Sequence, residues 1–151
     1  MNEKSYNIKF VAIDVISKSL HEPGKELTEK QDFTFNFLVD LKVNQEQKMA
    51  AVITDVTILR VKDNFKAAYF KLLCVFEFPD FDQIFKKIEE KRYDTPIELE
   101  ILLKSTGIST IRGVIYSELK GTYLHNAVMP LIDMASLVKA QRQKSEMTIK
   151  K

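Results

Sequence analysis

The residues best suited to catalysis or metal binding are few in this sequence and lie far apart. The two histidines, His21 and His125, have no histidine four residues away and no neighbouring cysteine, so neither has the spacing of a zinc site. His125 could act as a general base only with a nucleophile or substrate in reach, and the sequence supplies neither. We therefore interpret His125 as a structural loop residue and predict no catalytic residue and no metal site.

The sequence gives no sign of a nucleotide-binding site either. The four glycines, at positions 24, 107, 113 and 121, are too sparse for a phosphate-binding loop. The single cysteine, Cys74, lies in an apolar strand pattern and is expected to be a buried thiol. The carboxylate pair Glu89 and Glu90 falls where a solvated helix is expected. We predict a protein that is not an enzyme and uses no cofactor.

The length and composition favour one globular domain. The chain has 151 residues, of which 45% are hydrophobic and 29% charged, values near the average for globular proteins. Even the longest apolar runs, such as residues 72–76, are far too short for a signal sequence or a membrane span. We therefore expect a cytoplasmic protein that does not insert into a membrane.

The net charge of +2 is distributed unevenly along the chain. Residues 139–151 hold five basic groups against the single acid Glu146. This segment lacks aromatic residues and is little denser in charge than an ordinary terminus, so we expect no nucleic-acid partner. We predict one domain over residues 1–138, followed by a basic tail over residues 139–151 that frays.

Apolar and polar residues alternate in four segments, which is typical of strands half buried in a sheet. The segments are residues 7–20, 32–44, 48–61 and 65–78. The second is the most regular, because Phe33, Phe35 and Phe37 face one way and Thr34 and Asn36 the other. In the third and fourth segments both faces carry apolar residues, so we expect both to be covered.

The first segment has apolar residues on both faces as well. Strict alternation places Phe10, Ala12 and Asp14 on one face and Ile13 and Val15 on the other.

The connections between these segments indicate the topology of the sheet. Short polar breaks join the second, third and fourth segments, with the spacing of antiparallel hairpins. A longer polar loop, interrupted by Pro23 and Gly24, joins the first segment to the second. Three hairpin-linked strands and a fourth joined by a long crossover predict a Greek key.

The apolar period becomes helical after Pro79. Phe81, Ile84, Phe85 and Ile88 are spaced as one face of a helix, which predicts a surface helix packed on the sheet.

A second, longer helix is predicted to start at Thr95 and Pro96, with Gly107 weakening or breaking its centre. The core of a single domain is too small to bury the aliphatic stripe of this helix. We therefore expect the stripe to pack on the same helix of another copy. A short final helix is expected from Asp133, which is placed to cap it. The predicted interface residues of the long helix are Ile101, Ile108, Ile111, Ile115 and Leu119.

The order of these elements, together with one stretch near the C-terminus, resembles the SecB protein-export chaperones. The stretch begins at Ile111, passes through the turn formed by Gly121, Thr122 and Tyr123, and continues past Pro130 into the final helix. The resemblance covers residues 7–138 as a pattern of elements.

This resemblance implies an α+β domain, in which C-terminal helices pack on one face of a four-stranded antiparallel Greek-key sheet. It also implies a homotetramer, built as a dimer of dimers through the long helices. The implied activity is the ATP-independent binding of unfolded polypeptides or preproteins in apolar grooves. Burial of apolar surface is non-directional, so such a groove accepts many sequences.

We place the client site along the crossover loop, the exposed part of the second strand and the apolar loop before the final helix. Large apolar side chains there would give affinity without reading a sequence. The predicted client-binding residues are Leu20, Leu27, Phe33, Phe35, Tyr123, Leu124, Val128, Met129 and Leu131.

The sequence also departs from the family pattern. The well-known export members are acidic and end in a metal-binding tail that docks the SecA translocase motor, whereas the tail here is basic and has neither cysteine nor histidine. Binding to a SecA-type motor therefore stays in doubt. A SecB-like chaperone dedicated to a toxin–antitoxin system fits the sequence equally well.

Two other classes of protein also stay open. One is a small-ligand carrier or enzyme with a pocket between sheet and helices, in which His125, Tyr123 and Asp133 supply the polar groups. The other is a purely structural oligomer that binds no client.

Overall fold

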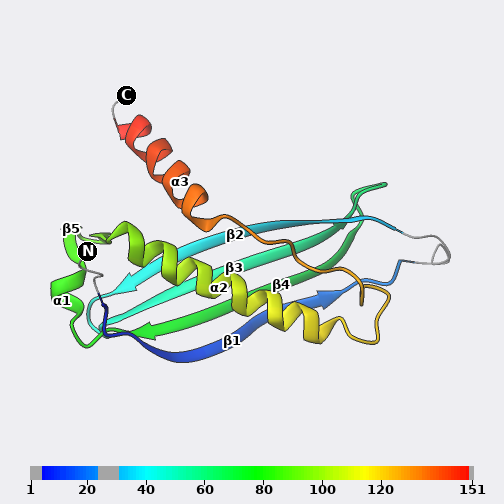
Figure 1. The fold of residues 1–151 in the computed structure, drawn as a ribbon, viewed down its shortest axis with the longest axis horizontal. Coiled ribbons are helices and arrows are strands. Elements are labelled where there is room, and N and C mark those ends of the chain that lie inside the picture. The colour runs from blue at the N-terminus through cyan, green and yellow to red at the C-terminus, as the bar shows by residue number, and fades with distance from the viewer. Residues whose placement is uncertain (1–4, 24–30, 150–151) are drawn as a thin grey trace.

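A four-stranded antiparallel sheet forms the centre of the structure. The computed structural model describes residues 5–23 and 31–149. The strands are β1 (Lys9–Leu20), β2 (Phe33–Asn44), β3 (Met49–Arg60) and β4 (Lys66–Glu77). They lie in the order β1-β4-β3-β2 (Figure 1). The long connection that follows β1 therefore leads to β2 at the opposite edge of the sheet, and β1 pairs with β4. This arrangement is a Greek key, and it confirms the predicted α+β class and topology.

The two edges of the sheet differ in regularity. The β2 strand pairs with β3 over twelve successive residues without a shift in register. The β1 strand is shifted twice against β4, between Phe10 and Ala12 and between Val15 and Ser17. Each shift is a bulge that turns the following residues to the other face.

The bulges correct the predicted faces of β1. Phe10, Ile13 and Val15 lie opposite Phe76, Cys74 and Leu72, which are core residues of β4. Directly opposed residues share a face, so these three apolar side chains all point to the helix side of the sheet. The strict alternation that placed Phe10 with Asp14 was wrong, because it allowed for no extra residue.

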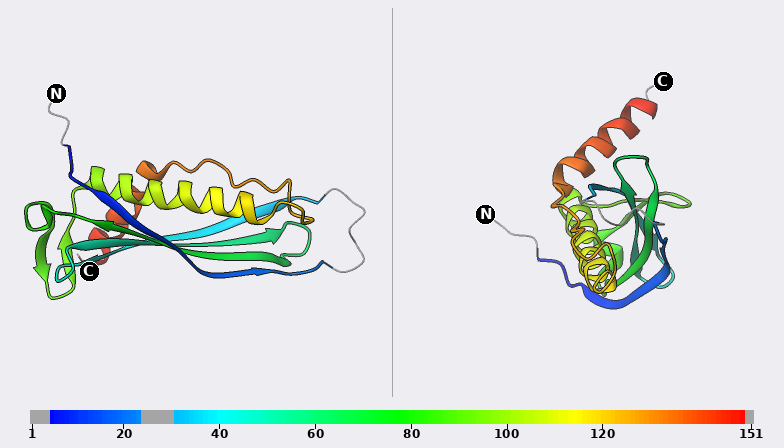
Figure 2. Two further views of the ribbon diagram at one scale, coloured as in Figure 1. Left: turned by 90° about the horizontal axis from the view of Figure 1, so that it is seen from below. Right: turned by 90° about the vertical axis from the view of Figure 1, so that its right-hand side faces the viewer.

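Helix α2 (Ile97–Glu118) is unbroken and packs on one face of the sheet (Figure 2). Its buried stripe includes Ile108, Ile111 and Ile115, and Leu119 directly after the helix is buried as well. These residues form the core with the inward side chains of β2, β3 and β4. The expectation that they contact another copy is therefore corrected, since they are covered by the chain's own sheet; Ile101 is half-buried against the same core.

Gly107 allows the centre of α2 to approach β3 closely. A Cβ atom at this position would lie 2.7 Å from Cγ1 of Val52 and 3.1 Å from Oγ1 of Thr54. Both neighbours are fully buried, so neither has room to move. The glycine predicted to break the helix is thus where the helix touches the sheet.

We expect Gly107→Ala to lower the free energy of unfolding by about 1–3 kcal/mol, because overpacking outweighs the gain in helix propensity. Gly113→Ala in the same helix is the matched control, since a Cβ there has nothing within 4 Å. The control should raise stability by about 0.5–1 kcal/mol. Urea denaturation of both variants tests this expectation, and a stabilised Gly107→Ala would contradict it.

The segment after Pro79 differs from the predicted helix. It forms one helical turn, α1 (Phe81–Ile84), and then a hairpin of β5 (Lys86–Glu89) and β6 (Arg92–Asp94). Phe81 and Phe85 are buried and stack with each other and with their aromatic neighbours, while Ile88 is exposed on the hairpin. The helical spacing of the apolar residues was therefore misleading.

Helix α3 (Met134–Ile149) begins at Asp133, as predicted. The carboxylate of Asp133 accepts hydrogen bonds from the backbone N–H and the hydroxyl of Ser136, at 3.1 and 2.6 Å. These bonds hold the pKa of Asp133 below its usual range. The helix continues to Ile149, so the predicted fraying of the tail from residue 139 is wrong for the described part of that tail.

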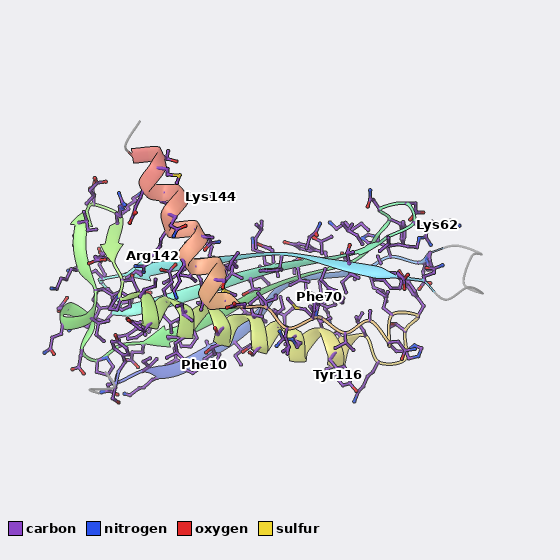
Figure 3. All side chains as sticks on the ribbon, turned by 45° about the horizontal axis from the view of Figure 1, so that its top comes forward. Phe10, Lys62, Phe70, Tyr116, Arg142 and Lys144 are labelled. Carbon is purple, nitrogen blue, oxygen red and sulfur yellow. The ribbon has the colours of Figure 1, made fainter. Side chains whose placement is uncertain are left out.

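Helix α3 packs on the domain from Met134 as far as Arg142. Met134 and Val138 are buried, whereas residues 143–148 are exposed. Figure 3 shows Arg142 close to the domain and Lys144 on the part of α3 that stands clear of the sheet. Across residues 5–23 and 31–149, no helix is long and apolar enough to cross a membrane.

Candidate functional site

The connection between α2 and α3 is fixed by polar contacts at both ends. Arg112 on α2 donates from Nε to the carbonyl of Met129 (3.2 Å) and from Nη2 to that of Pro130 (3.0 Å). Tyr123 donates its hydroxyl to the carbonyl of His21 at the end of β1 (2.6 Å). Burial raises the pKa of Tyr123, and the nearby Glu22 adds to this shift, so the hydroxyl stays a donor near neutral pH.

Several apolar side chains lie at the surface near the two ends of this connection. Leu131 is 91% exposed although it follows directly on the carbonyls that Arg112 binds, and Val128 is exposed as well. Leu20 is exposed at the end of β1, beside the residue that Tyr123 contacts. Phe33 and Phe35 on β2 and Tyr123 itself are half-buried against the core. We call the set Leu20, Phe33, Phe35, Tyr123, Val128 and Leu131 the crossover patch.

Three predicted client-binding residues do not belong to this patch. Leu124 and Met129 are buried, at 0% and 3% exposure, and are part of the core. They cannot contact a client while the domain is folded, so their assignment is corrected. Leu27 lies outside the described residues.

A second apolar surface was missed by the sequence analysis. Phe10, Ile13 and Val15 point to the helix side of the sheet, yet α2 packs on β2, β3 and β4 and leaves them exposed. The bulge residues Val11 and Ile16 are also exposed. The signal was present, since β1 carries apolar residues on both faces, but the sequence does not show that β1 is an edge strand.

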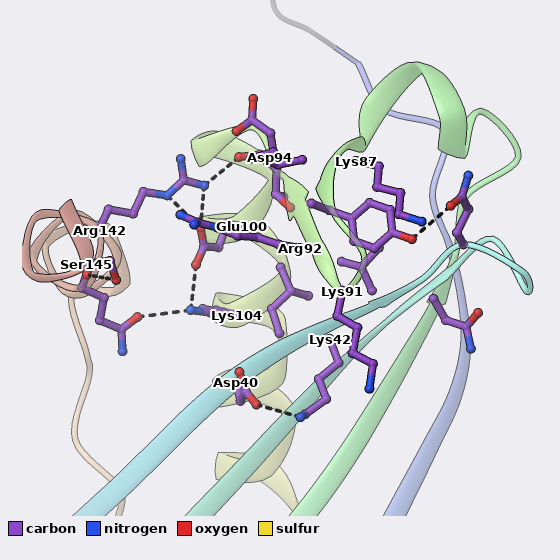
Figure 4. A pocket seen from close by; sticks show the side chains of 18 of the residues that line it. Asp40, Lys42, Lys87, Lys91, Arg92, Asp94, Glu100, Lys104, Arg142 and Ser145 are labelled. Carbon is purple, nitrogen blue, oxygen red and sulfur yellow. Dashed lines mark hydrogen bonds and ion pairs between the residues drawn. The ribbon is translucent and has the colours of Figure 1, made fainter. Parts of the chain in front are cut away.

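A polar cleft of about 1270 Å³ lies between β2, the β5–β6 hairpin and α3 (Figure 4). Glu100 occupies one wall of it and is bound from two sides. Lys104 Nζ lies 2.8 Å from Oε1 of Glu100, and Arg142 Nη2 and Nε lie 2.6 and 2.9 Å from Oε2. Lys104 also reaches Gln141 (3.2 Å), and Arg142 reaches the carbonyl of Thr95 (2.7 Å). The network ties α3 to the start of α2.

Two cations beside one carboxylate explain how Glu100 stays charged in this partly buried network. Burial raises the pKa of Glu100, but the hydrogen bonds and charges of Lys104 and Arg142 outweigh it and leave the pKa below its ordinary value. Glu100 is therefore ionised at neutral pH. The spacing of Glu100 and Lys104, four residues apart in a helix, was readable from sequence, whereas the contribution of Arg142 was not.

The three polar residues proposed for a small-ligand pocket do not converge. The Nδ1 atom of His125 contacts the carbonyl of Thr122 in its own turn (2.9 Å), and Asp133 caps α3. None of His125, Tyr123 and Asp133 lines the polar cleft. Among the described residues, no three metal-binding side chains are grouped as a metal site would require.

Comparisons with known proteins give a likeness of fold. Neither a protein-family model nor a curated protein matches the sequence. Similar solved structures include the SecB-like chaperone of Mycobacterium tuberculosis in complex with a ChAD peptide from the HigA1 antitoxin. That chain is 15% identical, with a TM-score of 0.48, and the likeness covers 82% of this chain and 83% of the other.

Proposed function

We propose that this protein is a non-enzymatic, SecB-like chaperone that binds unfolded polypeptides through the crossover patch, without nucleotide. The observation that carries this proposal is the exposure of Leu131 and Val128 on a backbone held by Arg112. The sequence resemblance to SecB implies the same activity.

The physical argument concerns the state of these side chains before binding. An apolar side chain in water gains about 1.5–3 kcal/mol when a partner buries it fully. Because Arg112 and Tyr123 already fix the backbone, little further ordering is required on the chaperone's side. The half-buried aromatic residues of the crossover patch add contact area without selecting a sequence.

The cellular role has two alternatives within this proposal. One is the holding of preproteins for export, with or without a SecA-type motor, and the other is service to a toxin–antitoxin system. Both place the protein in the cytoplasm. The two alternatives differ in the client that is bound. Binding assays with a preprotein and with an antitoxin segment would therefore distinguish them.

The direct test is suppression of aggregation. At a stoichiometric ratio, the purified protein should prevent light scattering by an unrelated, chemically unfolded protein diluted into buffer without nucleotide. Added ATP should change nothing. Unchanged aggregation at a tenfold molar excess would contradict the proposal.

We also propose that the protein is a homo-oligomer, with β1 rather than the buried stripe of α2 at the interface. Phe10, Ile13 and Val15 supply an apolar surface that the chain itself leaves uncovered. Light scattering at micromolar concentration should show an oligomer, and Ile13→Asp should dissociate it. Ile88→Asp, at an equally exposed position on the hairpin, is the control. A monomeric wild-type protein would contradict this assignment.

A further inference from the structure

The outer edge of β2 is available to another strand. In the described sheet β2 pairs only with β3, and its register runs through twelve residues without a bulge. The other edge, β1, carries two bulges, a common device against pairing with foreign strands. A long, regular edge strand exposes unpaired backbone N–H and C=O groups.

The polar cleft runs along this edge. Eight successive residues, 39–46, line it from β2 and the turn that follows. At about 3.3 Å per residue, the six strand residues 39–44 extend over about 20 Å. Side chains of α3 and of the β5–β6 hairpin form the opposite walls (Figure 4). The volume of about 1270 Å³ exceeds the usual 300–1,000 Å³ of a small-molecule pocket and suits a longer ligand.

The charges of the cleft narrow the class of ligand. Six basic and six acidic side chains line it, so it has no net attraction for a polyanion. Its inner wall is the ion-pair network of Glu100, Lys104 and Arg142, which an apolar ligand would not match. A chain with polar side chains of both signs and a backbone able to form hydrogen bonds matches both the walls and the edge.

We propose that this cleft binds an extended, polar polypeptide segment, which adds to β2 as a fifth strand over Val39–Asn44. Every second residue of an edge strand turns its N–H and C=O outward, so this stretch offers about six main-chain hydrogen bonds. Side chains of the bound segment would alternate between the network and the side of the sheet that carries Asp40 and Lys42. The site is separate from the crossover patch and does not depend on the chaperone proposal.

Amide hydrogen exchange provides the test. The probe is an eight-residue peptide that alternates threonine with lysine and glutamate, at millimolar concentration. Exchange of every second amide in Val39–Asn44 should slow at least tenfold. A peptide N-methylated at its two central residues, which blocks both of its edges, should bind at least tenfold more weakly. Unaltered exchange in these amides, or equal binding of the methylated peptide, would overturn the proposal.

A steric variant confirms the location. Ser145 lines the cleft from α3 and is exposed, so Ser145→Trp should fill the cleft and abolish the protection without unfolding the helix. Gln143→Trp, exposed on α3 but outside the cleft, is the matched control and should bind normally. Equal loss in both variants, or displacement of the peptide by a ten-nucleotide oligothymidylate, would show that the site is not the one proposed.

Discussion

Replacing Glu100 with glutamine should lower the free energy of unfolding by about 3 kcal/mol, because it leaves two cations of a mostly buried network without their counter-charge. The Glu100 side chain is 14% exposed and that of Lys104 is 7% exposed, so water replaces little of the lost interaction. Arg142 would also lose both of its bonds to a carboxylate. Urea denaturation followed by circular dichroism measures the change.

The matched control is Glu118→Gln, which breaks the ion pair of Lys18 and Glu118. Its side chains are 56% and 41% exposed, and such surface pairs contribute about 0–1 kcal/mol. Equal losses in Glu100→Gln and Glu118→Gln would show that the network contributes nothing beyond a surface pair.

The pH dependence of stability gives this prediction a second measurement. The folded-state pKa of Glu100 lies below its ordinary value, which is about 4.3 in an unfolded chain. Its contribution is therefore complete above that value and is lost as the pH falls through the lowered folded-state pKa. Wild-type protein should lose stability in this acidic range, and Glu100→Gln should lose measurably less.

The sheet was predictable because its strands carry the period of two residues in the sequence. The alternation from Phe33 onward fixed β2 to within one residue, since one face of that strand packs on the core. In β3 the polar Thr54 is buried beneath Gly107, yet the surrounding alternation was strong enough to define the strand. Short polar breaks then gave the hairpins.

The predictions for β1 and for the segment after Pro79 were wrong because each apolar pattern is compatible with two different local structures. Val11 and Ile16 are extra residues in β1, but both are apolar, so the alternation looked intact and the bulges were not visible. Phe81 and Phe85 are spaced as in a helix, and they are buried because Phe78 and Tyr93 stack around them. These tertiary contacts outweigh the local helical preference.

The candidate site shows the same limit. Val128, Met129 and Leu131 are all large apolar residues of one loop, and the sequence gives no reason to separate them. The structure separates them because Arg112 binds the carbonyls of Met129 and Pro130, which turns Met129 inward and leaves Leu131 outside. Such hydrogen bonds, from a side chain to backbone carbonyls distant in sequence, cannot be predicted from the residue types of the loop.

That separation makes the client site testable without loss of the fold. The double variant Val128→Ser and Leu131→Ser should bind an unfolded client about a hundredfold more weakly, since the burial of one valine and one leucine contributes about 3 kcal/mol. Both side chains are exposed in the free protein, so its thermal stability should change little. Fluorescence anisotropy with a labelled unfolded client measures the affinity.

Two control variants, one at an exposed apolar residue and one in the core, distinguish binding through the crossover patch from non-specific apolar binding. Leu38 is 72% exposed on the face of the sheet that carries no helix, so Leu38→Ser removes an equally apolar side chain on the face opposite Phe33 and Phe35 and should leave affinity unchanged. Leu124→Ala removes a core side chain and should cost about 2–5 kcal/mol of stability. If the double variant binds the client as the wild type does, or if Leu38→Ser weakens binding as much, the crossover patch is not the client site.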